Sequence, residues 1–138
     1  MKRTLLSIAL IFVFLSLKSQ YNQGIKIEQL LKTDTTTTGQ KIIYPFSEND
    51  EVTILRITIE PGQSTGWHKH EIPVFAYVLK GNLTVELEDN KTIVYQQNSS
   101  FSEVINTLHN VINKGNENII LIAFFMGEKG KALSKHKE

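Results

Sequence analysis

A chain of 138 residues is long enough for one compact domain and too short for two ordinary ones. Hydrophobic residues make up 41% of it and charged residues 21%, which excludes an intrinsically disordered chain and a protein with several membrane spans. The chain has no cysteine, which excludes disulfide bridges, thiolate metal ligands and a cysteine nucleophile.

Residues 1–19 have the layout of a secretory signal peptide. Two basic residues precede an apolar run, Leu5–Leu17, that only two serines interrupt. The run is shorter than the roughly 20 residues that a spanning helix needs. We therefore expect cleavage before Gln20, no permanent membrane span, and export to the periplasm or the extracellular space. An uncleaved anchor is the alternative.

The expected mature domain, residues 20–138, is slightly acidic. Residues 1–19 hold three of the 15 basic side chains and none of the 14 acidic ones, so residues 20–138 carry a formal net charge of −2. This balance gives no reason to expect nucleic-acid binding.

Beyond Gln20 the hydrophobic pattern is that of β-strands. Leu55, Ile57 and Ile59 are separated by single residues, and the segment 83–88 alternates in the same way. Turn-forming residues separate the runs. We expect strands near 25–32, 41–45, 51–60, 73–80, 83–88, 91–95, 100–105, 109–113 and 118–126. Many short strands without an amphipathic helix predict a closed barrel or a sandwich.

Two polar segments are expected to lack regular structure. The run Thr33–Thr38 is low in complexity and is predicted to be a loop. The tail Lys129–Glu138 is charged and is predicted to fray. His136 lies in this tail, so we expect it to be exposed to solvent and not to bind a metal.

His68 and His70 are the first residues that indicate chemistry. Residues i and i+2 of a strand point to the same face, so the two imidazoles are expected to lie side by side. With a third donor they can hold one divalent ion such as Fe, Mn, Zn, Ni or Cu. The alternative is a pair of surface histidines that alternate by chance.

Two longer segments place these histidines in a known pattern. The first reads PGQSTGWHKHEIPVFAYVLKG from Pro61, and the second reads FSEVINTLHNVIN and ends at Asn113. In order and spacing they resemble the two motifs of the cupins, particularly small single-domain bacterial cupins, over about residues 25–129. The resemblance implies an all-β, cupin-type jelly-roll β-barrel in which His109 is the third metal ligand.

The sequence departs from the cupin motif at one ligand. Seven residues before Gly81, where the motif usually has a glutamate, the chain has Val74. Glu71 is close by but adjoins a histidine, so it is expected to point to the opposite face unless the strand bends. Glu103, six residues before His109, is the better compensating carboxylate, either as a fourth ligand or as an acceptor for an imidazole N–H. The alternative for Glu103 is a solvated strand residue.

The resemblance also implies that the barrel interior is a substrate pocket. Trp67 has the opposite parity to the histidines and is expected to pack outward. The aromatic residues available to line the pocket or to fill the core are Phe75, Tyr77, Phe101, Phe124 and Phe125.

Two functional hypotheses follow from the resemblance. The first is a metal-dependent enzyme, dioxygenase-like or isomerase-like, that acts on a small organic substrate. The second is a non-catalytic cupin of the cell envelope that binds a small ligand or a metal. Cupins often pair through sheet edges, so a homodimer using the stretch Ile25–Lys32 is a further hypothesis.

Overall fold

The computed structural model describes residues 28–44 and 47–137, and the expected signal peptide lies outside them. All the regular structure in these residues is β. None of the described residues forms a helix that is long and apolar enough to cross a membrane. The strands are β1 (Asp50–Ile59), β2 (His68–Lys69), β3 (Val74–Lys80), β4 (Leu83–Leu87), β5 (Thr92–Tyr95), β6 (Ser100–Ser102), β7 (His109–Ile112), β8 (Ile119–Glu128) and β9 (Lys135–His136).

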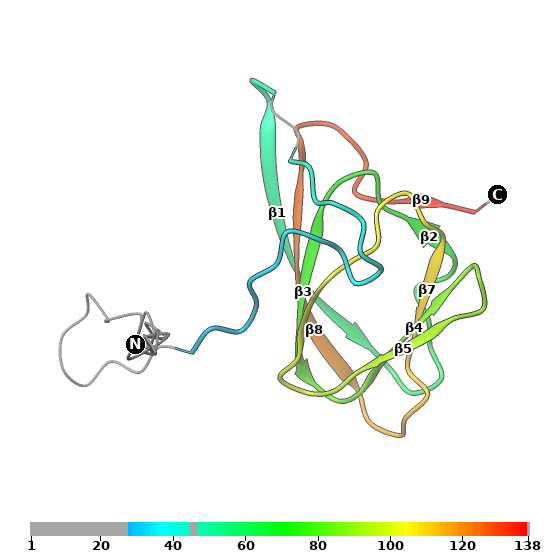
Figure 1. Ribbon diagram of the computed structural model, residues 1–138. Coiled ribbons are helices and arrows are strands. Elements are labelled where there is room, and N and C mark those ends of the chain that lie inside the picture. The colour runs from blue at the N-terminus through cyan, green and yellow to red at the C-terminus, as the bar shows by residue number, and fades with distance from the viewer. Residues whose placement is uncertain (1–27, 45–46, 138) are drawn as a thin grey trace, which may run out of the picture.

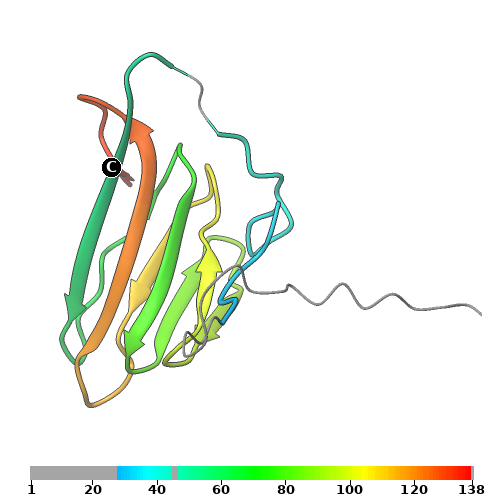
Figure 2. The same cartoon turned by 90° about the vertical axis from the view of Figure 1, so that its left-hand side faces the viewer.

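The strands form two antiparallel sheets that face each other (Figures 1 and 2). One sheet has four strands in the order β1, β8, β3, β6. The other has five strands in the order β5, β4, β7, β2, β9. Consecutive strands often belong to different sheets, so the connections cross between the two layers. The two sheets enclose one core, and the all-β prediction is confirmed.

The core lies between the sheets because the strands alternate. On β3, Val74, Ala76 and Val78 are buried, and Ala76 is in register with both Phe101 on β6 and Ala123 on β8. Residues in register across a sheet share a face, so all of these point into the interior. The opposite sheet contributes buried apolar residues to the same cluster: Leu83, Val85, Leu87 and Val111.

Asn113, the last residue of the second sequence motif, forms side-chain hydrogen bonds that connect segments at one end of the barrel. It is 1% exposed, and its Nδ2 donates to the carbonyl oxygens of Ile59 at 2.8 Å and Glu117 at 2.7 Å. Its Oδ1 accepts from the Gly115 amide at 2.9 Å. One buried amide thus ties the end of β1 to the turn between β7 and β8 and satisfies main-chain groups there.

The outer face of the four-stranded sheet is unusually apolar. Ile54 and Phe75 are both in register with Phe124, so the three share the face opposite to the core. Ile54 is 58% exposed and Phe124 is 38% exposed. Of the five aromatic residues considered for the pocket, Phe101 and Phe125 therefore face inward, whereas Phe75, Tyr77 and Phe124 face outward. Homodimerisation stays a prediction.

The expected strands from 51–60 to 118–126 are confirmed to within a few residues, but two N-terminal expectations are wrong. Residues 28–32 form no strand, and residues 25–27 lie outside the described part of the chain. Residues 41–44 form no strand, Lys41 makes only an isolated bridge to Thr35, and residue 45 lies outside the described part of the chain. The loop at Thr33–Thr38 is confirmed, and Thr37 anchors it by donating from Oγ1 to the Ser102 carbonyl at 2.6 Å.

The C-terminal tail is the third departure from expectation. Lys135–His136 forms β9 at the edge of the five-stranded sheet, next to β2 (Figure 1). Leu133, the one large apolar residue among residues 129–138, packs against the cluster of Val74, Ala123 and Phe125. This anchor explains why a lysine-rich tail is ordered and does not fray.

Candidate metal centre

The three motif histidines come together because of the pairing of two short strands. His68 on β2 is in register with His109 on β7, which puts both side chains on one face of the sheet. His70 follows two residues later and forms a parallel bridge with Ile105. All three side chains are buried, and His109 is fully inaccessible to solvent. The alternative of two surface histidines is wrong.

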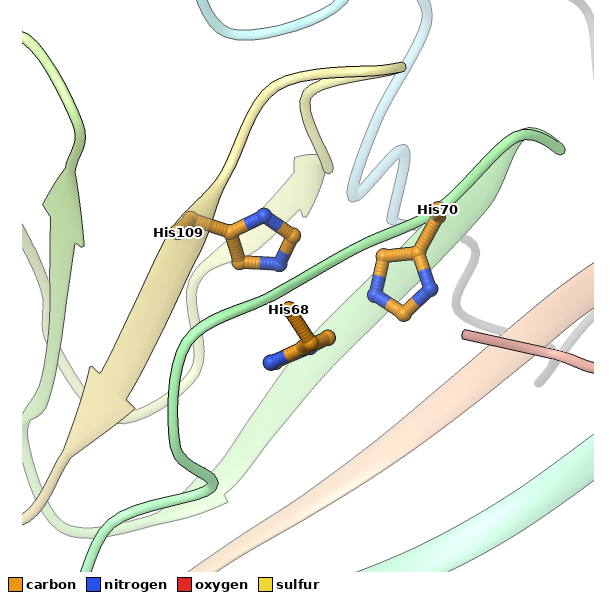
Figure 3. Close-up of side chains that lie close together, drawn as sticks. All are labelled: His68, His70 and His109. Carbon is orange, nitrogen blue, oxygen red and sulfur yellow. The ribbon is translucent and has the colours of Figure 1, made fainter. Parts of the chain in front are cut away.

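The imidazole rings converge on one point (Figure 3). Their centroids are separated by 4.4 Å for His68 and His109, 4.9 Å for His68 and His70, and 5.1 Å for His70 and His109. Each ring offers one nitrogen, and these nitrogens all lie within 4.8 Å of one another. Three nitrogen donors this close, each on a different side of a common centre, can hold a single ion.

Main-chain carbonyl groups set the orientation of every ring. Each Nδ1 lies within hydrogen-bonding distance of a main-chain carbonyl oxygen. The pairs are His68 with Gly66 at 2.8 Å, His70 with Leu133 at 2.8 Å, and His109 with Thr107 at 3.0 Å. A carbonyl oxygen only accepts hydrogen bonds, so each Nδ1 carries the proton. The lone pair of each neutral ring is therefore on Nε2, the atom available to a metal.

The electrostatics of the site favour neutral imidazoles. Burial lowers the pKa of all three histidines, and it lowers the pKa of His70 from 6.5 to about 4. The hydrogen bonds to main-chain carbonyls oppose this shift without cancelling it. The imidazoles are thus uncharged at neutral pH, with a proton on Nδ1 and none on Nε2, as metal ligation requires.

A buried atom without a hydrogen-bond partner shows that the site fits a metal. His109 Nε2 is buried and has no hydrogen-bond partner among the described residues. Leaving a buried polar nitrogen unpaired costs about 1–3 kcal/mol, so such an atom needs an explanation. A divalent ion shared with His68 and His70 satisfies it, and three neutral nitrogens suit the borderline metals.

Glu103 lies beside this cluster and is not a solvated residue. Its backbone amide donates to the Val74 carbonyl at 2.8 Å, and its side chain is 8% exposed. One carboxylate oxygen, Oε2, lies 3.5 Å from His109 Nε2, without the geometry of a hydrogen bond. Burial raises the pKa of Glu103 from 4.5 to about 7. The carboxyl group therefore titrates near neutral pH next to the candidate ion position.

The other acidic residue considered as a ligand points away from the cluster. Glu71 is exposed, and its Oε1 accepts from Lys135 Nζ at 2.8 Å on the outside of the barrel. The expectation that Glu71 faces away from the two histidines is confirmed. Val74, in contrast, is 1% exposed and lies opposite Phe125, whose ring centroid is 5.5 Å from that of His70. Val74 thus forms part of the apolar wall next to the histidines.

Sequence reasoning missed the contribution of the C-terminal tail to this site. The Leu133 carbonyl is the acceptor that orients His70. His136 is exposed, as expected, but its ring centroid lies 5.8 Å from that of His68. The signal that could have indicated an ordered tail is Leu133 itself, a lone large apolar residue in a charged segment.

Comparisons with known proteins agree with this architecture. Residues 55–125, just over half of the chain, match the sequence profile of the cupin domain. No curated protein matches the chain. These comparisons confirm the expected jelly-roll β-barrel in a single domain.

Three solved structures illustrate the similarity in fold. A Bacillus halodurans protein aligns with 62% of this chain and 69% of its own, at 21% identity and a TM-score of 0.52. A Cupin 2 conserved barrel domain protein from Salinispora arenicola aligns over 61% and 71%, at 16% identity and a TM-score of 0.51. A cupin-like protein from Thermotoga maritima aligns over 62% and 64%, at 15% identity and a TM-score of 0.55.

Proposed function

Because this chain belongs to the cupin family, we propose that it binds one divalent metal ion through the Nε2 atoms of His68, His70 and His109. The observation that carries the proposal is the hydrogen bond from each Nδ1–H to a main-chain carbonyl, which leaves three Nε2 lone pairs facing one point. Three imidazoles suit Fe, Mn, Zn, Ni or Cu. When bound, such an ion supplies Lewis acidity to a substrate oxygen.

We further propose that the protein is an enzyme and that Glu103 transfers protons in it. A general acid or base works best when its pKa lies near the working pH; burial raises the pKa of Glu103 to about 7 in the metal-free site, and a bound cation draws this pKa back down. Its carboxylate is 3.5 Å from a ligand nitrogen, so a substrate bound at the ion lies within its reach. Of the dioxygenase-like and isomerase-like reactions expected for the fold, proton transfer by Glu103 supports the isomerase-like one.

The chemistry of the donors suggests the class of substrate. Three neutral nitrogens leave the charge of a divalent ion uncompensated except by Glu103. The positions that the three ligands leave open therefore favour an anionic oxygen. We propose a small organic anion, held against the apolar wall of Val74 and Phe125.

The alternative is a cupin that binds a metal or a small ligand without turnover. The observation that favours it is the depth of the site, since all three imidazoles are buried. Deep burial slows ligand exchange and suits storage as well as catalysis. Turnover of a small organic acid by the metal-loaded protein, and its loss in Glu103→Gln with metal retained, would favour the enzyme.

Elemental analysis tests the metal site itself. We expect one divalent ion per mature chain purified without added metal, and none in His109→Ala. Lys69→Ala is the matched control, because Lys69 lies between the two β2-region histidines and points to the opposite face. Equal metal content in the wild type and His109→Ala would contradict the proposed site.

A further inference from the structure

The C-terminal segment, residues 129–137, is built into the rim of the candidate metal centre. Its strand β9 pairs with β2, so that Lys135 is in register with Lys69 and His136 with His68. Beyond the strand, the Lys137 amide donates to the Trp67 carbonyl at 2.9 Å. Figure 1 shows this last strand beside β2, at the edge of the five-stranded sheet. The segment is thus held by a continuous main-chain ladder.

Side-chain contacts fix the same segment at two more points. Lys135 Nζ donates to Glu71 Oε1 at 2.8 Å on the outer side. On the inner side, Leu133 packs against the cluster that contains Val74 and Phe125, and its carbonyl accepts from His70 Nδ1 at 2.8 Å. The segment that carries His136 therefore also orients one of the three buried imidazoles.

The strand register places a fourth imidazole in line with two of the ligands. His109, His68 and His136 occupy opposing positions on β7, β2 and β9. Side chains at opposing positions point to the same face of a sheet, so His136 projects to the side on which His68 and His109 converge. Its ring centroid lies 5.8 Å from that of His68, whereas the centroids of the three buried rings are 4.4–5.1 Å apart.

The ring of His136 projects to this side, 5.8 Å from the ring of His68, so rotation of its side chain can bring it toward the ion while β9 keeps its pairing. Strand β9 is the edge strand of its sheet, so no further strand lies on the open side of His136. The imidazole of His136 is exposed and is free to turn. The ion has room for it, because Val74 supplies no donor and a three-ligand site keeps open positions.

We propose that His136 is a fourth, exchangeable metal ligand, delivered from the C-terminal strand to the ion held by His68, His70 and His109. The inference rests on the proposed metal site and deepens it. An exposed ligand on an edge strand can leave when a substrate or another oxygen ligand takes its place. The C-terminal strand then controls how many coordination positions of the ion are available to substrate or water.

The test counts imidazoles on the ion and does not depend on activity. The mature protein is loaded with one equivalent of Cu(II), and pulsed electron paramagnetic resonance counts the coordinated imidazoles from their remote nitrogens. We expect four in the wild type and three in His136→Ala. Affinity, measured by competition with a chelator, is expected to fall about tenfold or more in His136→Ala. Lys137→Ala, a change at the next residue of the same segment, is the matched control and is expected to keep four.

The outcomes separate this inference from the metal site on which it rests. Three imidazoles in both the wild type and His136→Ala would overturn the role of His136 and leave the three-histidine site intact, whatever the affinities. Absence of bound Cu(II) in the wild type would overturn both. Because His136 is exposed, His136→Ala should melt, without metal, at the wild-type temperature, which checks that any loss comes from the ligand.

Discussion

Glu103, the first residue after β6, lies beside Val74, the first residue of β3. The Glu103 amide donates to the Val74 carbonyl at 2.8 Å, and both side chains are buried between the sheets. The cupin motif has its carboxylate at the position of Val74, whereas this chain carries one directly after the neighbouring strand β6. The acidic group of Glu103 still lies next to the histidines, with Oε2 3.5 Å from His109 Nε2.

Moving the carboxylate back should therefore preserve the metal site. In the double variant Val74→Glu, Glu103→Val, the carboxylate returns to the motif position, where it can bind the ion directly and add an anionic oxygen to three nitrogens. We expect chelator competition to show binding at least as tight as in the wild type. Val74→Glu alone places two carboxylates side by side, and like charges in a buried site destabilise the fold. Binding no tighter than in Glu103→Gln would show that position 74 does not reach the ion.

The stability of the metal-free protein should depend on pH through Glu103. Its pKa is 4.5 when exposed and about 7 in the fold, so the folded state holds its proton more tightly and the contribution of Glu103 to stability falls as pH rises from 4.5 through 7. The shift corresponds to roughly 3 kcal/mol. Glu103→Gln stays neutral, so chelator-treated Glu103→Gln should be more stable than wild type at pH 8 by up to that amount. Urea unfolding at pH 4 and pH 8 measures the difference, which should nearly vanish at pH 4.

Metal retention should extend below the pH at which ordinary histidine sites release their ions. Protons compete with a metal for Nε2, and burial lowers the pKa of His70 from 6.5 to about 4 and also lowers those of His68 and His109. Competition therefore begins only at lower pH. Metal content after equilibration at a series of pH values should stay constant as the pH is lowered to 6.5 and should decrease only at still lower pH. A midpoint of release above pH 6.5 would contradict buried, neutral ligands.

Removal of the ion should lower thermal stability in the wild type only. An ion that binds the folded site and not the unfolded chain stabilises the fold by about 3 kcal/mol at a free concentration one hundred times its Kd. A chelator should therefore lower the Tm of the wild-type protein and leave that of His109→Ala unchanged. Differential scanning calorimetry of both proteins, with and without chelator, measures this. A chelator effect of the same size on His109→Ala would place the stabilising ion elsewhere.

The predicted cleavage of residues 1–19 does not depend on the structure of the barrel. We expect expression with residues 1–19 to give a soluble exported protein that begins near Gln20, because the apolar run is too short to span a membrane comfortably. Intact mass of the product from the exported fraction checks the cleavage site. A full-length chain that stays in the membrane fraction would favour an uncleaved anchor.

The sequence predicted the central strands and the histidine cluster because those features are local. Alternation at Leu55, Ile57 and Ile59 needs only a period of two, and the two histidines of β2 share a face for the same reason. The third ligand, His109, came from the resemblance to the cupin motifs, since no spacing rule joins residues about 40 positions apart. Its register with His68 is a property of the folded sheet.

What the sequence did not predict depends on contacts between distant segments. Strand β9 contains lysine and histidine, which have no strand pattern, and it forms because β2 offers an open edge and Leu133 anchors the tail. The environment of Glu103 likewise depends on β3 lying beside it. Conversely, the largely apolar segment that begins at Lys41 was expected to form a strand, but among the described residues it makes only the bridge from Lys41 to Thr35.

The three acceptors that hold the imidazoles have an evolutionary consequence, because all of them belong to the main chain. A carbonyl group is present whatever side chain a residue carries. Thr107 and Leu133 can therefore be replaced over time without loss of the hydrogen bond, provided that the local backbone path survives. Gly66 is the exception, since its φ of +74° strains any residue with a Cβ. Homologues should vary at the first two positions and retain glycine at the third.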